Sequence, residues 1–356
     1  MPSPDLATPL ETMIDAEKTL MFAEASEGGY AVERFLNHNR AALARLAARL
    51  KANPPRSVTT CARGSSDHAA TFGKYLVETL LGVPTSSAAL SVSSIYAAPV
   101  VASDSLCIAI SQSGRSPDLL TAVEAHRKAG AYVVVLVNDE DSPLTALADE
   151  LLPLKCGPEK SVAATKSYIT SLAALAAIAA TWAGDDALID ALNDLPRLLK
   201  EAFKLDWSAA LPSLTGARNL FVIGRGYGFA VAQEAALKLK ETCALHAEAF
   251  SSAEVRHGPM AIVNDGFPIL AFATSDAAGE GVRDVAAEFI SRGASVLMAD
   301  GEALAGATCL PTLKTAPALE PILQIQSFYR LANRLSVARG LDPDSPPHLN
   351  KVTRTV

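Results

Sequence analysis

Residues 105–120 read SLCIAISQSGRSPDLL, and this stretch decides the fold of the chain. The apolar run at 106–110 indicates a buried strand, and the residues that follow it are small or carry hydroxyl groups. Ser116 can cap a helix beginning at Pro117, because serine is favoured at the N-cap and proline at the first helical position. A strand that leads through a short loop into a helix is typical of a parallel sheet covered by helices.

The same alternation of strand and helix recurs along most of the chain. Residues 10–51 predict two helices separated by Gly28 and Gly29, and the Ala-rich segment 171–182 predicts a helix packed in the core. The β-branched run at 132–137 indicates a strand that is buried on both faces. We predict strands at 57–61, 105–110, 132–137, 219–223, 269–273 and 295–298, and helices at 67–81, 118–128, 229–244 and 280–291.

Landmarks of the first half of this pattern return in the second half. Arg63 and Arg225, each followed by glycine, lie 162 residues apart, and so do Ser113 and Ser275. A shared offset indicates an internal duplication. We therefore predict an α/β fold with two tandem subdomains, each a parallel sheet flanked by helices. The predicted boundaries are an N-terminal helical segment at 1–55, subdomains at 56–200 and 201–340, and a C-terminal tail at 341–356.

The composition limits the classes of function. The 356 residues are 49% hydrophobic and 19% charged, which is typical of a globular protein. The net charge is −7 and Lys and Arg form no block, so we expect no nucleic-acid partner. The five cysteines are widely spaced without a C-x-x-C, so we expect reduced thiols in a cytoplasmic protein. The segment 171–182 is too short to span a bilayer, so we expect no membrane association.

The loop at 111–116 has the features of an anion site. Ligands of doubly wound sheets bind beyond the carboxyl ends of the strands, where helices begin. The hydroxyls of Ser111, Ser113 and Ser116 and the backbone N–H groups near them can converge on one point, as phosphate sites at helix N-termini do. A capped turn without a ligand remains the alternative. In the second half, Asp276 stands where a phosphate would be repelled, so we expect an anion in the first half only.

Two other loop motifs do not match a nucleotide site. Residues 224–228 read GRGYG after a predicted strand, but the third glycine is misplaced for a dinucleotide fold. In place of a second strand ending in an acidic residue, the polar stretch 246–258 follows the helix. Gly73-Lys74 is followed by Tyr75, which excludes a P-loop.

Residues 235–259 carry the greatest density of chemically active side chains. Lys238 and Glu241 are three residues apart on a predicted helix and are therefore neighbours. Spacing alone favours a solvated, salt-bridged face for this pair and a structural role for His257. Together, a histidine, a carboxylate and an amine also supply what an aldose–ketose conversion needs: ring opening, proton transfer next to a carbonyl, and an amine.

Six motifs occur in an order that identifies a family. They read CARGSSDHAA, SQSGRSPDLL, EKSVAATKSY, ALKLKETCALHAEAF, EVRHGPMA and DPDSPPHLNKVT. Through them the chain, from about residue 57 to its end, resembles the sugar isomerase (SIS) family, in particular the isomerase half of glucosamine-6-phosphate synthase. The resemblance implies two SIS subdomains and a phosphosugar ligand. The residues implied to bind the phosphate are Ser111, Gln112, Ser113 and Ser116, and those implied to lie near the sugar are Ser65, Ser66, Val162 and Ala164.

The resemblance also implies catalytic roles. Glu241 is expected to be the acid/base that moves a proton, with Lys238 as its charged neighbour near C1 and C2. His257 is expected to open the sugar ring in the site of a neighbouring subunit, which implies a homodimer. Lys351 is expected to contact the open-chain sugar and to be able to form an imine with its carbonyl. Neither a metal nor a cofactor is expected.

The chain departs from the synthases at several positions. Pro2 follows Met1 where the synthases have a nucleophilic cysteine, and about 55 residues before the first strand are too few for a glutamine-hydrolysing domain. Ala164 replaces a serine that contacts the sugar, and Arg115 replaces an acidic residue, which adds positive charge beside the phosphate. Without an ammonia supply, we expect the proton transfer to run as deamination of glucosamine 6-phosphate to fructose 6-phosphate and ammonia.

Three alternatives to this function stay open. A fructosamine-6-phosphate deglycase would use the same scaffold with a different pocket facing C1. A galactosamine-6-phosphate deaminase/isomerase would differ in the sugar. A non-catalytic phosphosugar sensor belongs to another class, and the presence of Glu241 and Lys351 argues against it.

Overall fold

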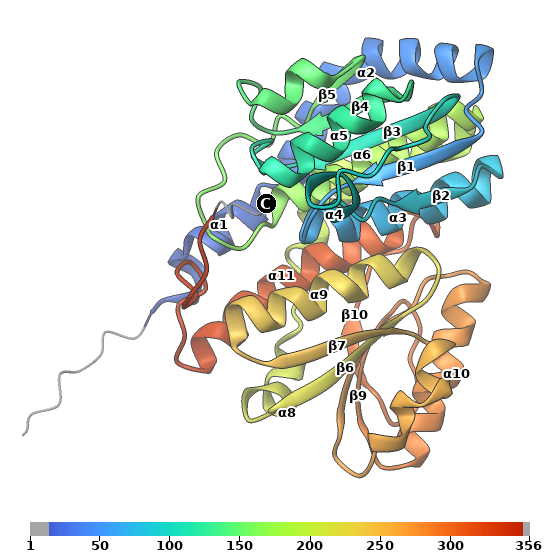
Figure 1. Ribbon diagram of the computed structural model, residues 1–356. Coiled ribbons are helices and arrows are strands. Elements are labelled where there is room, and N and C mark those ends of the chain that lie inside the picture. Colours follow the sequence, from blue (N-terminus) through green and yellow to red (C-terminus); the bar gives the residue numbers. More distant parts are fainter. Residues whose placement is uncertain (1–13, 352–356) are drawn as a thin grey trace, which may run out of the picture.

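The computed structural model describes residues 14–351 and contains two five-stranded parallel sheets (Figure 1). Residues 1–13 of the predicted N-terminal segment and 352–356 of the predicted tail lie outside the described residues. The strand order is β2-β1-β3-β4-β5 in the first sheet and β10-β9-β8-β6-β7 in the second. Read from the other edge, the second order matches the first strand for strand. The predicted fold class, two tandem subdomains with parallel sheets, is confirmed.

The elements have the following bounds. The first sheet contains β1 (Ser57–Cys61), β2 (Thr85–Ser87), β3 (Ser105–Ser111), β4 (Tyr132–Val137) and β5 (Glu150–Pro153). The second contains β6 (Asn219–Gly224), β7 (His246–Ser251), β8 (Pro268–Phe272), β9 (Ser295–Asp300) and β10 (Thr308–Pro311). The α-helices are α1 (Leu20–Ser26), α2 (Gly28–Ala52), α3 (Ser65–Leu81), α4 (Ser91–Ser94), α5 (Pro117–Lys128), α6 (Lys166–Ala183), α7 (Asp186–Ala202), α8 (Leu211–Thr215), α9 (Tyr227–Cys243), α10 (Ala277–Ser291) and α11 (Glu320–Ala338). Short 3₁₀ helices are η1 (Ala16–Lys18), η2 (Pro143–Leu147), η3 (Ser208–Ala210), η4 (Glu254–His257) and η5 (Pro259–Ile262).

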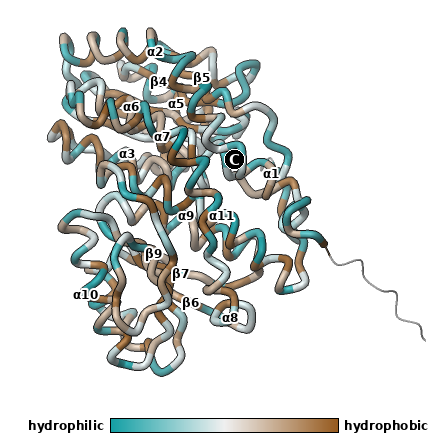
Figure 2. Tube along the Cα trace, turned by 180° about the vertical axis from the view of Figure 1, so that it is seen from behind, coloured by the Kyte–Doolittle hydropathy of each residue, from teal (hydrophilic) through white to brown (hydrophobic). Residues whose placement is uncertain are grey.

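The helices on the inner faces of the two sheets pack against one another. The helices α2, α3 and α6 cover the inner face of the first sheet, α9 and α11 cover that of the second, and α3 packs against α9 between them (Figure 1). One hydrophobic cluster therefore runs through both halves, and Figure 2 shows hydrophobic stretches passing through the interior of each. The outer faces are covered separately, by α5 in the first half and by α10 in the second.

The strand order of the first sheet contains one topological switch point. From β1 the chain passes through α3 to the edge strand β2, whereas from β3 it passes through α5 on the other face to β4. The connections therefore diverge between the neighbouring strands β1 and β3, which is the topological switch point where doubly wound sheets bind ligands. Ser65 and Ser66 begin α3 after the loop that ends β1, and the serines of residues 111–116 start at the last residue of β3.

The predicted inner strands agree with the structure to within one or two residues, because continuous apolar runs mark them. The prediction was wrong for residues 246–258, which were taken as a polar stretch in place of a strand. His246–Ser251 form β7, an edge strand with exposed His246 and Glu248, so its sequence lacks an apolar run. The other strands that the prediction missed, β2, β5 and β10, are short and include the remaining sheet edges. The prediction also missed α11, whose buried Gln and Ser residues interrupt its apolar pattern.

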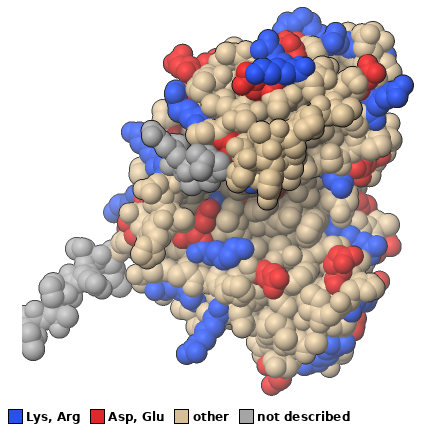
Figure 3. All heavy atoms as spheres, in the orientation of Figure 1, with Lys and Arg blue, Asp and Glu red and all other residues tan. Residues whose placement is uncertain are grey.

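Two surface properties bear on the expected partners. None of the helices in the described range 14–351 has the length and apolar character that crossing a membrane requires. Figure 3 shows basic and acidic side chains interspersed over the visible face.

Candidate active site

The segment 111–116 begins at the last residue of β3 and carries three serine hydroxyls. The backbone N–H of Gly114 donates to Ser111 Oγ at 2.9 Å, which closes a tight turn. Gly114 has φ of +62°, and a Cβ there would stand 2.2 Å from Ser142 Oγ, so only glycine fits. Ser116 occupies the N-cap position of α5, but its hydroxyl makes no capping bond. The predicted cap is therefore positional only, and the Ser116 hydroxyl is left for another partner.

Gln112 and Ser113 lie half-buried between these serines. The backbone carbonyl of Gln112 accepts from the N–H of Asp139 at 3.2 Å, which joins this loop to the one after β4. The sequence analysis expected Arg115 to add positive charge beside the phosphate, and this expectation was wrong. Its guanidinium donates twice to Asp139, at 3.0 and 2.8 Å, so the carboxylate compensates its charge.

An ion pair joins the two loops across the switch point. Arg63, in the loop after β1, donates to the buried carboxylate of Asp118 in α5 at 2.9 and 2.7 Å. Ser65 and Ser66 follow as the first residues of α3. The pair therefore holds the predicted sugar-side serines beside the predicted phosphate loop.

The equivalent loop of the second half already contains carboxylates. The backbone N–H and the hydroxyl of Ser275 both donate to Glu320, at 2.7 and 2.8 Å. Asp276 caps α10 by accepting from the N–H of Gly279 at 3.1 Å. Residues of the chain itself thus supply the negative charge at this position.

Lys238 lies at the centre of a buried acid–base cluster. Its ammonium lies 2.5 Å from Glu241 Oε2, 3.4 Å from Glu234 Oε1 and 3.1 Å from Ser65 Oγ. The spacing of Lys238 and Glu241 favoured a solvated face, and this interpretation was wrong: the Lys238 side chain is 1% exposed. The reason is tertiary, because α9 is enclosed between α3 and α11.

Glu234 is a site residue that the sequence reasoning missed. Its side chain is fully buried and lies 3.1 Å from Ser65 Oγ, from His68 Nδ1 and from the hydroxyl of Tyr329. The available signal was spacing, because Glu234 is one helical turn before Lys238 on the same face of α9. A buried carboxylate requires compensation, and these partners supply it.

The charges of the cluster raise the pKa of a lysine and of a tyrosine. Burial alone would lower the pKa of Lys238, but the attraction of Glu234 and Glu241 outweighs it and raises this pKa above 10.5. Burial, together with the charge of Glu234, raises the pKa of Tyr329 well above its ordinary value. The lysine is therefore a fixed cation beside Glu241, which is the carboxylate of the cluster that reaches the surface.

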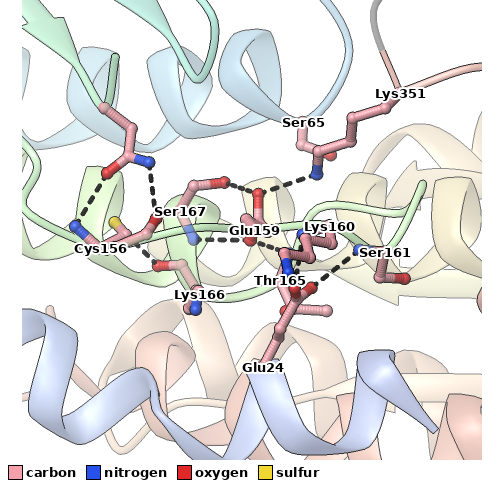
Figure 4. Close-up of polar contacts among 12 residues, drawn as sticks. Glu24, Ser65, Cys156, Glu159, Lys160, Ser161, Thr165, Lys166, Ser167 and Lys351 are labelled. Atoms are coloured by element: carbon pink, nitrogen blue, oxygen red, sulfur yellow. Dashed lines mark hydrogen bonds and ion pairs between the residues drawn. The ribbon is translucent and has the colours of Figure 1, made fainter. Parts of the chain in front are cut away.

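Lys351 lies at a second carboxylate, Glu159, which the sequence reasoning also missed. Lys351 Nζ donates to Glu159 Oε2 at 3.1 Å (Figure 4). Burial alone would raise the pKa of Glu159, but Lys351 and the N–H groups of Thr165 and Ser167 outweigh it and lower this pKa. Val162 and Ala164, both half-buried, lie in the same loop before α6. The predicted tail residue and the predicted sugar-side loop are therefore joined by one carboxylate.

The tail also passes Glu241. A cavity of about 230 Å³ is lined by Glu241 and its neighbours on α9 and by the tail residues Leu341, Asp342, Pro347 and Leu349. The C-terminal end of α9 and the chain leading to Lys351 thus border the same space.

His257 is not brought to the cluster within one chain. It is exposed at the end of η4, beyond β7, and in residues 14–351 no hydrogen bond or ion pair joins it to Glu241 or Lys238. Over the same range the structure contains no group of three His, Cys, Asp or Glu side chains that could hold a metal ion.

Comparisons with known proteins agree with this geometry. The SIS domain model matches residues 53–181 and 213–303. An isomerizing glutamine–fructose-6-phosphate aminotransferase of Symbiobacterium thermophilum is 35% identical over 315 residues, which cover 83% of this chain and 51% of that protein. The chain thus spans about half the length of the curated relatives it matches.

Two solved structures illustrate how widely the fold is shared. A candidate phosphosugar isomerase of Silicibacter pomeroyi DSS-3 is 42% identical, with a TM-score of 0.88 over 92% of this chain and 100% of that one. A glucosamine-6-phosphate deaminase of Thermotoga maritima, 22% identical, has the same fold, with a TM-score of 0.77 over 95% and 100% of the two chains. The matched model, the aminotransferase homology and the tandem sheets together establish that this chain belongs to the SIS domain family.

Proposed function

We propose that the chain catalyses the isomerising deamination of glucosamine 6-phosphate, giving fructose 6-phosphate and ammonia. The observation that carries the proposal is the buried Glu234–Lys238–Glu241 cluster, which Ser65 joins to the topological switch point beside the serines of the loop 111–116. A carboxylate beside a permanent cation suits a proton transfer in which negative charge develops on the substrate. Water is the only co-substrate required.

The pyranose opens to the aldehyde, and Glu241 removes the proton from C2, giving an enolate whose negative charge on O1 Lys238 stabilises. The same carboxyl returns this proton to C1, and a proton passes from the amine nitrogen to O1, which leaves a ketose imine at C2. Water adds to C2, the C–N bond breaks, and ammonia and fructose 6-phosphate leave. The loop 111–116 would hold the 6-phosphate still, since positioning can contribute a large part of the rate enhancement.

Lys351 and Glu159 would act on the open-chain form. In this proposal Lys351 contacts the carbonyl end of the sugar, by hydrogen bond or imine, and Glu159 holds the amine in place. Their 3.1 Å contact and the shared loop with Val162 and Ala164 support the assignment.

We propose a homodimer in which His257 opens the ring in the site of the second copy. Within one chain His257 is exposed and makes no contact with the cluster, so a role in this site needs a second copy. Exposed apolar side chains support an interface: Ile262 lies near His257, and Val92, Ile95, Tyr96 and Val101 lie in residues 91–101. All five cysteines are free thiols, which supports the cytoplasm as the location.

One assay tests the reaction. The purified protein is incubated without glutamine with glucosamine 6-phosphate, galactosamine 6-phosphate or a 6-phosphorylated fructosamine, and ammonia, ketose phosphate and free amino acid are measured. Ammonia from the first sugar alone supports the proposal. Ammonia from the second moves it to a galactosamine-6-phosphate deaminase, and release of an amino acid from the third moves it to a deglycase.

Substitution of Glu241 tests the acid/base assignment. Glu241→Gln keeps the shape of the side chain but cannot accept a proton, so we expect kcat to fall by about 10²–10⁴-fold while phosphosugar binding changes little. The control is Glu201→Gln, the same change on the exposed face of α7. Normal turnover in Glu241→Gln would show that another group is the base.

A further inference from the structure

We propose that the short helix α1 positions the sugar-side loop and the C-terminal tail, and that Glu24 is the positioning residue through which it acts. The inference deepens the proposed function, on which it rests for the roles of Lys351 and the 157–166 loop. Both oxygens of Glu24 accept from backbone N–H groups of this loop, so we assign Glu24 no direct part in the chemistry.

Glu24 holds the backbone of the loop before α6. Its side chain is buried, and its two oxygens accept from successive N–H groups, Lys160 at 2.5 Å and Ser161 at 3.1 Å (Figure 4). Residues 157–165 are neither helix nor strand, so those N–H groups have no partner in regular structure. A buried N–H group without an acceptor destabilises the conformation that buries it, and Glu24 supplies both acceptors.

The next carboxylate of the loop receives the tail. Directly before Lys160 stands Glu159, whose Oε1 accepts from Thr165 and Ser167 and whose Oε2 lies 3.1 Å from Lys351 Nζ. Fixing Lys160 and Ser161 therefore fixes the backbone that orients Glu159, and Glu159 in turn orients the amine of Lys351. Figure 4 shows this chain of contacts from Glu24 to Lys351.

The other end of α1 binds the tail directly. Asp344 accepts from the first two N–H groups of α1, Leu20 at 2.6 Å and Met21 at 2.7 Å. The helix is itself anchored to α11, because Gln326 donates to the carbonyl of Ala25 at 2.8 Å and Thr19 donates to Asn333 at 2.7 Å. One rigidly held helix of seven residues thus contacts both segments that meet at the Glu159–Lys351 pair.

A carboxylate is the group that this position requires. Glutamine has nearly the same shape but presents one oxygen and one N–H₂ group, so one of the two loop N–H groups would face a donor. Glu24→Gln should therefore loosen the loop while leaving the core and the phosphate loop at 111–116 unchanged.

The test combines hydrogen exchange with kinetics. In Glu24→Gln we expect the amides of residues 157–167 to exchange roughly tenfold faster or more, because two bonds to a charged acceptor are disturbed. We expect kcat with glucosamine 6-phosphate to fall about 10–100-fold and KM to change by less than about threefold, because the phosphate loop is intact. The matched control is Glu17→Gln, the same change on the same N-terminal segment, where the exposed carboxylate pairs with Arg334.

Two results would overturn the proposal. One is that the amides of residues 157–167 exchange in Glu24→Gln at the same rate as in the wild type. The other is that these amides exchange faster while kcat is unchanged. If the wild-type protein releases no ammonia, the proposed function is wrong. The hydrogen-exchange measurement needs no substrate, so it would still test whether Glu24 holds the loop.

A second variant guards against a folding defect. Asp344→Asn weakens the tail contact at the opposite end of α1, and thermal unfolding shows whether each variant is folded. If both contacts serve the placement of Lys351, the losses in kcat of Glu24→Gln and Asp344→Asn should be less than additive in the double variant. Strictly additive losses would mean that α1 does not link the two segments.

Discussion

Replacing Lys238 by methionine should lower the free energy of unfolding far more than the loss of one surface charge does. The ammonium lies between Glu241 and Glu234, and the Glu234 side chain is fully buried. Methionine fills similar volume but leaves Glu234 without its cation. Removing one partner of a buried ion pair costs about 3–5 kcal/mol, a large part of the roughly 5–15 kcal/mol that stabilises a typical protein.

Denaturant unfolding at pH 7 measures this cost. The control is Lys128→Met, whose ammonium makes an exposed pair with Glu124 on α5, so the free energy of unfolding should hardly change. Adding Glu234→Gln to Lys238→Met removes the uncompensated charge and should restore about 1–3 kcal/mol. Recovery would show that charge, and not lost packing, causes the instability.

The pH dependence supplies an independent check. The pKa of Lys238 is raised above 10.5 in the folded protein, so its stabilising contribution is complete below pH 10.5 and is lost as the pH rises through the folded value. The difference in stability between the wild type and Lys238→Met should therefore shrink above about pH 10.5. If Lys238→Met is as stable as the wild type at pH 7, the assignment of Lys238 as a buried compensating cation is wrong.

Two further substitutions test the loop 111–116 and the equivalent loop of the second half. Gly114→Ala should cost about 1–3 kcal/mol in thermal unfolding and weaken binding of glucosamine 6-phosphate, because the new Cβ meets Ser142 in a left-handed backbone conformation. The control Gly82→Ala has the same backbone strain with open space around it, and equal binding losses in both variants would contradict the steric argument. Glu320→Gln should cost about 1.5–3 kcal/mol, because the two bonds from Ser275 lose their charged acceptor. An unchanged melting temperature would show that this carboxylate does not stabilise the second loop.

Sequence alone predicted the parts of this protein that depend on neighbouring residues. Apolar runs marked the inner strands such as β3 and β4, because a strand buried on both faces must be apolar throughout. Small and hydroxyl residues marked the loop after β3, because turn geometry and anion binding both need them close together. Edge strands such as β7 escaped prediction, because one side of an edge strand faces solvent and its pattern resembles a loop.

The chemical environment of the site was decided by tertiary structure. Spacing put Lys238 and Glu241 on one face of a helix, but only the packing of α3 and α11 around α9 determined that this face is buried. Glu24, Glu159 and Lys351 are separated by more than 130 residues at each step, so no local pattern connects them. Helical periodicity states which side chains are neighbours, whereas burial and charge compensation depend on which distant segment the folded chain places opposite them.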